Sequence, residues 1–99
     1  MNYAKVVERS LNGDSDAIHM LCTLGKWTDG AGAQSHASIM WLLLHTMADS
    51  DFACAACCLG KSDRTHVLND FEFEAGMETP AFKAYMRRWF PESYKVLKN

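Results

Sequence analysis

The stretch IMWLLL at residues 39–44 decides the fold of this chain, because six consecutive apolar residues leave no polar face on a helix. A helix that is apolar all round is typical of an element that other helices surround. Ser35 stands shortly before this stretch and is a good N-cap residue. We therefore predict a central apolar helix over residues 36–48, with the remainder of the chain packed around it.

Segments on both sides of the central helix also have helical spacing. Apolar residues recur every three or four positions along residues 3–11 and again from Ser15 towards Gly25, as one face of a helix requires. The glycines within residues 28–34 predict a loop before the central helix. Further helices are predicted over residues 51–59, with Ser50 as cap and Gly60 as stop, over 62–76, over 80–90 and over 92–97.

Residues 71–74, with the sequence FEFE, alternate as a β-strand does. Four residues without a partner strand are weak support for a sheet, so we assign them to the helix over 62–76. The chain has 99 residues, of which 48% are hydrophobic, and contains no low-complexity tract. It is therefore predicted to be one domain over residues 1–99: an all-α, compact single-domain bundle of about six or seven short helices.

Charge is unevenly distributed along the sequence. Residues 1–63 contain four Lys or Arg and seven Asp or Glu, whereas residues 64–99 contain six and five. The net charge of −2 argues against a protein whose whole surface holds nucleic acid. Lys5, Glu8 and Arg9 interrupt the first apolar residues, which is not typical of an export signal. We expect a cytoplasmic protein without a membrane span, because a span needs roughly 20 apolar residues.

The cysteines suggest a metal site as one hypothesis. Two pairs of potential zinc ligands stand three residues apart within helical pattern, namely His19 with Cys22 and Cys54 with Cys57. Structural zinc pairs usually lie on turns, and cysteine often packs in the core as a small apolar residue. A redox pair is disfavoured because no strand precedes it, and the adjacent Cys57 and Cys58 are expected on different helix faces. We favour free thiols, with a zinc-stabilised helical domain as the third hypothesis for the protein.

Catalytic motifs are missing from the sequence. It contains no Gly-x-Ser-x-Gly, no phosphate-binding glycine loop and no His-Glu-x-x-His. His36 and His66 stand near predicted helix starts, where exposure to solvent is expected. We predict that the protein is not an enzyme and uses no cofactor.

Residues 67–90 match the pattern of a helix-turn-helix, with Gly76 as the turn glycine. Apolar residues occupy positions that this motif buries between its two helices; they are Leu68, Phe71, Met77, Phe82 and Met86. Glu72 departs from the pattern, because a small residue normally lies where the helices cross. The basic residues available to contact DNA are Lys83, Arg87 and Arg88. A DNA-binding regulator is therefore the alternative hypothesis.

Residues 80–90 combine this basic cluster with aromatic residues. A small domain cannot bury three Trp, three Tyr and five Phe completely, and aromatic residues with Arg are enriched at protein interfaces. The candidate partner-binding residues are Lys83, Tyr85, Arg87, Arg88, Trp89 and Phe90. The leading hypothesis is a small non-enzymatic helical interaction protein, of the inhibitor, immunity, antitoxin or phage-accessory type, that binds another protein. A homodimer is also compatible with such a surface.

Overall fold

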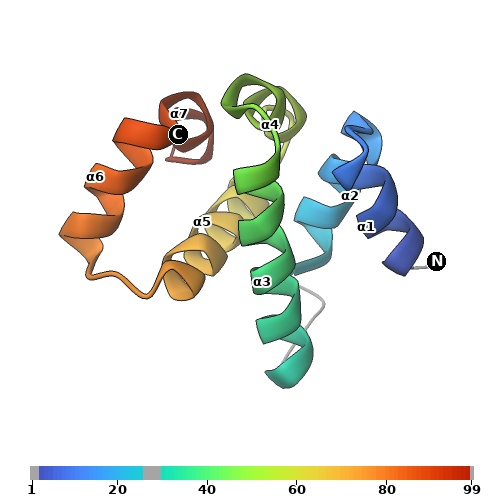
Figure 1. The fold of residues 1–99 in the computed structure, drawn as a ribbon, viewed down its shortest axis with the longest axis horizontal. Helices are drawn as coiled ribbons and strands as arrows, with labels where there is room; N and C mark the ends of the chain where they lie inside the picture. The colour runs from blue at the N-terminus through green and yellow to red at the C-terminus, as the bar shows by residue number, and fades with distance from the viewer. Residues whose placement is uncertain (1–2, 26–29, 99) are drawn as a thin grey trace.

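The computed structural model describes residues 3–25 and 30–98, and within these ranges the chain forms helices joined by short turns, without strands (Figure 1). The helices are α1 (Tyr3–Leu11), α2 (Ser15–Leu24), α3 (Gly30–Thr46), α4 (Asp49–Ala56), α5 (Lys61–Ala75), α6 (Thr79–Trp89) and α7 (Pro91–Lys98). The predicted all-α bundle of short helices is confirmed. None of the helices in these ranges has both the length and the apolarity that crossing a membrane requires.

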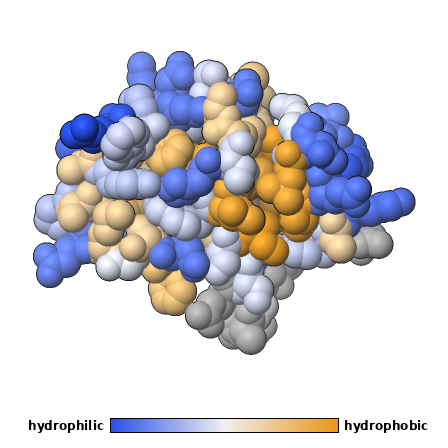
Figure 2. Space-filling model, in the orientation of Figure 1, coloured by the Kyte–Doolittle hydropathy of each residue, from blue (hydrophilic) through white to orange (hydrophobic). Residues whose placement is uncertain are grey.

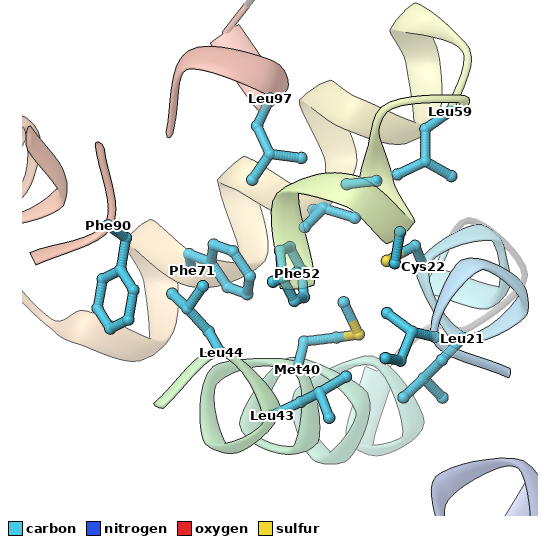
Figure 3. Packing of buried hydrophobic residues seen from close by; sticks show 14 of the residues in the cluster. Leu21, Cys22, Met40, Leu43, Leu44, Phe52, Leu59, Phe71, Phe90 and Leu97 are labelled. Carbon is cyan, nitrogen blue, oxygen red and sulfur yellow. The ribbon is translucent and has the colours of Figure 1, made fainter. Parts of the chain in front are cut away.

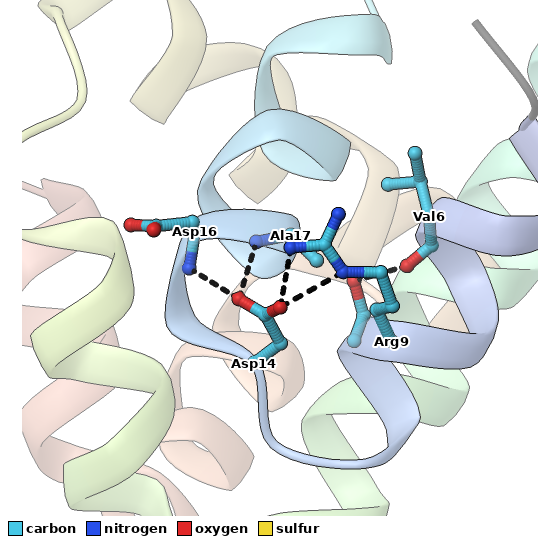
Figure 4. Close-up of polar contacts among 6 residues, drawn as sticks. Val6, Arg9, Asp14, Asp16 and Ala17 are labelled. Carbon is cyan, nitrogen blue, oxygen red and sulfur yellow. Dashed lines mark hydrogen bonds and ion pairs between the residues drawn. The ribbon is translucent and has the colours of Figure 1, made fainter.

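Asp14 fixes the turn between α1 and α2 (Figure 4). Its Oδ1 atom accepts hydrogen bonds from the backbone N–H groups of Asp16 and Ala17, at 3.0 and 3.2 Å. The guanidinium of Arg9 donates two further bonds to Oδ2, at 2.9 and 2.6 Å, and these bonds lower the pKa of the Asp14 carboxyl. Asp14 is therefore the N-cap of α2, and it also ties the end of α1 to that helix.

The central helix α3 faces the core with Met40, Leu43 and Leu44, which are buried (Figure 3). Its opposite face carries Leu42, whose exposed fraction is 53%, and Figure 2 shows hydrophobic side chains gathered over the α3 region. The expectation that neighbours surround α3 on every face is therefore wrong on this side. Helix α3 packs mainly against α5 and α1, so the side that carries Leu42 remains exposed although its sequence is apolar.

The start of α3 also differs from the prediction. The helix begins at Gly30, so the predicted loop is wrong for residues 30–34, while residues 28 and 29 lie outside the described ranges. Ala31, Ala33 and Gln34 are good helix formers, and in a helix continuous with the stable apolar stretch they outweigh the two glycines. Ser35 lies inside α3 and is not its cap.

The start of α4 differs from the prediction, and its first residue makes a tertiary contact. We predict Ser50 as a cap, but α4 begins at Asp49 and Ala48 occupies the N-cap position without a side-chain bond. The Asp49 carboxylate instead accepts hydrogen bonds from the backbone N–H groups of Glu92 and Ser93, at 2.8 and 2.9 Å. An acid from the first turn of α4 thereby caps α7, which fixes the C-terminal helix against α4.

The end of α4 and the start of α5 differ from the prediction. The end of α5 agrees with it. Helix α4 ends at Ala56, and Gly60 is the N-cap residue of α5 instead of the stop of α4. Gly76 ends α5 with a left-handed backbone, φ 65°, a conformation that favours glycine. Phe71 is buried whereas Phe73 is 67% exposed, so residues 71–74 form helix and not strand, as predicted.

Candidate functional site

Helix α6 presents four exposed side chains between its second turn and its C-terminal end, and we call this surface the α6 face: Lys83, Arg87, Arg88 and Trp89. Phe82 and Met86 are buried in the core, which turns Arg87 and Arg88 outward, and Trp89 extends from the last residue of the helix. Trp89 is 56% exposed. The guanidinium carbon of Arg88 lies 5.1 Å from the centroid of the Trp89 ring, within the range of a cation–π contact.

The cations of the α6 face have no acidic partner among the residues that the structure describes. Across residues 3–25 and 30–98, no ion pair within 4.0 Å joins Lys83, Arg87 or Arg88 to a carboxylate. Arg87 lies 5.9 Å from the ring centroid of Tyr94 on α7, and Lys98 lies 5.6 Å from the same centroid. Positive charge therefore continues from α6 onto α7 and remains available to an anionic surface.

Two of the predicted partner-binding residues hold α6 in place instead. Phe90 is only 9% exposed, and its ring centroid lies 4.9 Å from that of His45 on α3. Tyr85 is half-buried, and its hydroxyl lies 2.8 Å from Nε2 of His45. The prediction that Phe90 is exposed for a partner is wrong, because α3 supplies a ring for it to pack against.

The hydrogen bonds of His45 fix its tautomer. Its Nδ1 atom lies 2.8 Å from the backbone carbonyl oxygen of Trp41, which only accepts, so Nδ1 carries the proton. In the neutral ring Nε2 then accepts a hydrogen bond from the Tyr85 hydroxyl. The His45 and Tyr85 pair thus joins α3 to α6 and orients the α6 face.

The apolar residues of the predicted helix-turn-helix are buried or partly buried, but the two helices of the motif diverge. Phe71, Phe82 and Met86 are buried, and Leu68 and Met77 pack partly buried against the core. In Figure 1, α5 and α6 diverge from their connection, and α7 packs against both of them. This burial fits a helix-turn-helix and fits equally well two helices that are held together by a third.

The proposed zinc ligands are not assembled into a site. In the described part of the chain, no three His, Cys, Asp or Glu residues are grouped so that they could hold a metal ion. Cys22 lies in the core (Figure 3), where burial raises the pKa of its thiol to about 12. Cys54 and Cys57 are exposed, so the expectation of core packing holds for Cys22 but is wrong for these two.

A buried histidine was the feature that sequence reasoning missed. His36 is 2% exposed, and the Tyr3 hydroxyl lies 2.8 Å from its Nδ1 atom. Its buried Nε2 atom has no hydrogen-bond partner within residues 3–25 and 30–98. The expectation that His36 is solvated is wrong, and His66 is half-buried. Contacts from α1 and α5, far apart in sequence, enclose His36, and no local pattern indicates such contacts.

Gly25 makes room for the two imidazoles. A Cβ atom at this position would lie 2.6 Å from Cδ2 of His66 and 3.2 Å from Nε2 of His36. The backbone of Gly25 is right-handed helical, a conformation that alanine prefers. The glycine is therefore needed for the space that it leaves.

His66 also has an acidic neighbour on its own helix. Its Nε2 atom lies 3.7 Å from Oδ2 of Asp70.

Acid is expected to destabilise the protein through His36. Burial, and then the charge of His66, lower the pKa of His36 below its usual 6.5. The unfolded chain therefore takes up a proton before the folded chain does, and stability falls as the pH drops through about 6.5. Melting temperatures at pH about 7.5 and about 5.5 should show a smaller loss for His36→Gln than for the unmodified chain.

Comparing the unmodified chain with His36→Gln separates the effect of His36 on acid stability from that of Asp70. Burial raises the pKa of Asp70, so its folded form takes up a proton first and acid stabilises the protein at this group. Both chains share that contribution, and it cancels in the difference between them. An identical loss of melting temperature in both chains would contradict the role given to His36.

The arrangement of the α6 face suits recognition, since it presents fixed positive charge and an aromatic ring side by side. Comparison of the chain with models of known families, with curated proteins and with solved structures found no match. What the surface does must therefore be inferred from its own residues.

Proposed function

We propose that the protein is a small, non-enzymatic interaction module that uses the α6 face to bind an acidic surface of another protein. The observation that carries the proposal is the exposed Trp89 with Arg88 stacked beside it. A module of this kind would act in the cytoplasm as an inhibitor, immunity protein, antitoxin or phage-accessory factor.

An exposed tryptophan beside a cation is suited to a central position in an interface. Trp and Arg are the residues most enriched among those that dominate binding energy. The contact with Arg88 holds the ring and the guanidinium near one another before a partner arrives, so less side-chain freedom is lost on binding. Lys83 and Arg87, which have no acidic partner within residues 3–25 and 30–98, would steer an acidic partner towards the same face.

The positions of the cations favour a protein partner over DNA. A recognition helix contacts base edges with its N-terminal residues. In α6 the first turn contains no basic residue, and Arg87 and Arg88 lie in the last turn. Glu78 precedes the helix at the N-cap position, where it would approach the phosphates of a bound duplex.

Binding of duplex DNA should therefore be negligible at physiological salt. The measurement is fluorescence anisotropy of labelled duplexes, first at low salt and then at increasing salt. Weak, sequence-independent binding at low salt is expected from the basic cluster and should vanish as salt rises. Tight and sequence-dependent binding that Arg87→Ala and Arg88→Ala together abolish would instead establish the DNA-binding alternative.

Capture of a partner from the native host tests the protein-binding function directly. The bait is the full chain, and the comparison is with the Trp89→Ala variant. A protein that the full chain retains and the variant loses supports the proposal, while equal retention of every captured protein contradicts it.

A further inference from the structure

Two exposed thiols lie side by side just after α4. Cys57 and Cys58 follow Ala56, the last residue of α4, and both side chains are exposed. Their Sγ atoms are 3.7 Å apart. The expectation that the two side chains lie on different helix faces is therefore wrong, because the helix ends before them and the turn brings the sulfurs together.

The chain itself positions one of the two thiols. The Sγ atom of Cys57 lies 2.9 Å from the backbone carbonyl oxygen of Cys54, to which it donates a hydrogen bond. Cys57 also lines a surface hollow between α4 and α7, together with Cys54, Glu92 and Lys95. An ion from solvent can therefore reach the sulfurs without any movement of the core.

We propose that Cys57 and Cys58 form a two-thiolate binding site for a thiophilic divalent metal ion of the Zn²⁺ class. Two sulfurs that each lie about 2.3 Å from a tetrahedral Zn²⁺ are separated by about 3.8 Å. The observed separation of 3.7 Å matches this value. The pair is thus spaced to hold such an ion with little rearrangement of either side chain.

The end of α4 favours a cation at the thiols, and Lys95, which lines the same hollow, opposes it. The last carbonyl groups of a helix carry partial negative charge, and these thiols stand where α4 ends. Binding would replace the two thiol protons: each S–H bond breaks, each sulfur bonds to the metal ion, and two protons are released to solvent.

The chain supplies two ligands, and the other positions of the ion stay open to water. No group of three His, Cys, Asp or Glu residues in the described ranges is arranged to hold a metal, so Cys54 is not a third ligand. Sites with open positions exchange their ion and accept further ligands, unlike the closed four-ligand sites that hold a fold together. The fold should consequently not depend on this ion.

Titration with Cd²⁺, a spectroscopic substitute for Zn²⁺, tests the proposal. The full chain, kept reduced by a phosphine, is titrated while the thiolate-to-cadmium ultraviolet band is recorded. We expect one ion per chain, with displacement by Zn²⁺. Cys57→Ser and Cys58→Ser should each weaken binding at least about tenfold, because one of two soft ligands is lost, while Cys54→Ser should bind as the unmodified chain does.

A peptide of residues 55–60 provides the control for preorganisation. It contains both thiols without the fold, and it should bind Cd²⁺ about tenfold more weakly, because its side chains must first be ordered. The proposal fails if the peptide binds as tightly as the protein, if Cys54→Ser is as damaging as Cys57→Ser, or if no band forms. Circular dichroism of each variant verifies that the fold is retained.

Discussion

Replacing Phe71 with alanine is expected to lower the free energy of unfolding by about 3–5 kcal/mol. The Phe71 side chain is buried in the centre of the core (Figure 3), and its ring centroid lies 5.7 Å from those of both Trp41 and Phe52. The substitution would leave a cavity where α3, α4 and α5 meet. A loss of this size is a large part of the roughly 5–15 kcal/mol that stabilises a typical domain.

Phe73→Ala is the matched control for this experiment. Phe73 lies on the same helix two positions further on, and its side chain is 67% exposed, so its removal should change stability by about 0.5 kcal/mol or less. Urea unfolding followed by circular dichroism measures both variants. Equal losses would contradict the helix over residues 71–74, because only a strand places the two rings on one face.

Much of the fold follows from local signals in the sequence. The αL glycine Gly76 ends α5 and Asp14 caps α2, and both features depend on residues close by in the chain. The role of Asp49 could not be predicted, because it lies in the first turn of α4 and caps α7, which is more than 40 residues away in the sequence. Tertiary hydrogen bonds compete with local capping rules, and the sequence alone does not reveal their partners.

In the candidate site too, some features follow from the local sequence and others depend on contacts with distant residues. The exposure of Arg87 and Arg88 follows from helical spacing against the buried Phe82 and Met86. Trp89 shares the side of Phe82 and Met86 by that spacing, and it is exposed at the last residue of α6. The burial of Phe90 depends on His45 of α3, which no pattern within α6 indicates. The pairing of the Cys57 and Cys58 sulfurs depends on where α4 ends, and helical spacing extended past that point places them wrongly.

The second large effect is expected in binding. Trp89→Ala should weaken affinity for the captured partner by at least about 30-fold, equivalent to about 2 kcal/mol, as for other central interface tryptophans. Arg87→Ala should have a smaller effect that decreases as salt rises, because a cation at the edge of an interface contributes mainly through long-range attraction. Neither variant should change the stability of the free protein appreciably, since both side chains are exposed.

Titration of the purified partner, once capture has identified it, tests the function of the α6 face most directly. The unmodified chain, Trp89→Ala and Phe73→Ala are compared by calorimetry at physiological salt. Phe73 also exposes an aromatic ring, but it lies on α5 outside the α6 face. We predict that Trp89→Ala alone loses affinity, by at least about 30-fold. Unchanged affinity of Trp89→Ala, or an equal loss in Phe73→Ala, would contradict the assignment of the α6 face as the binding surface.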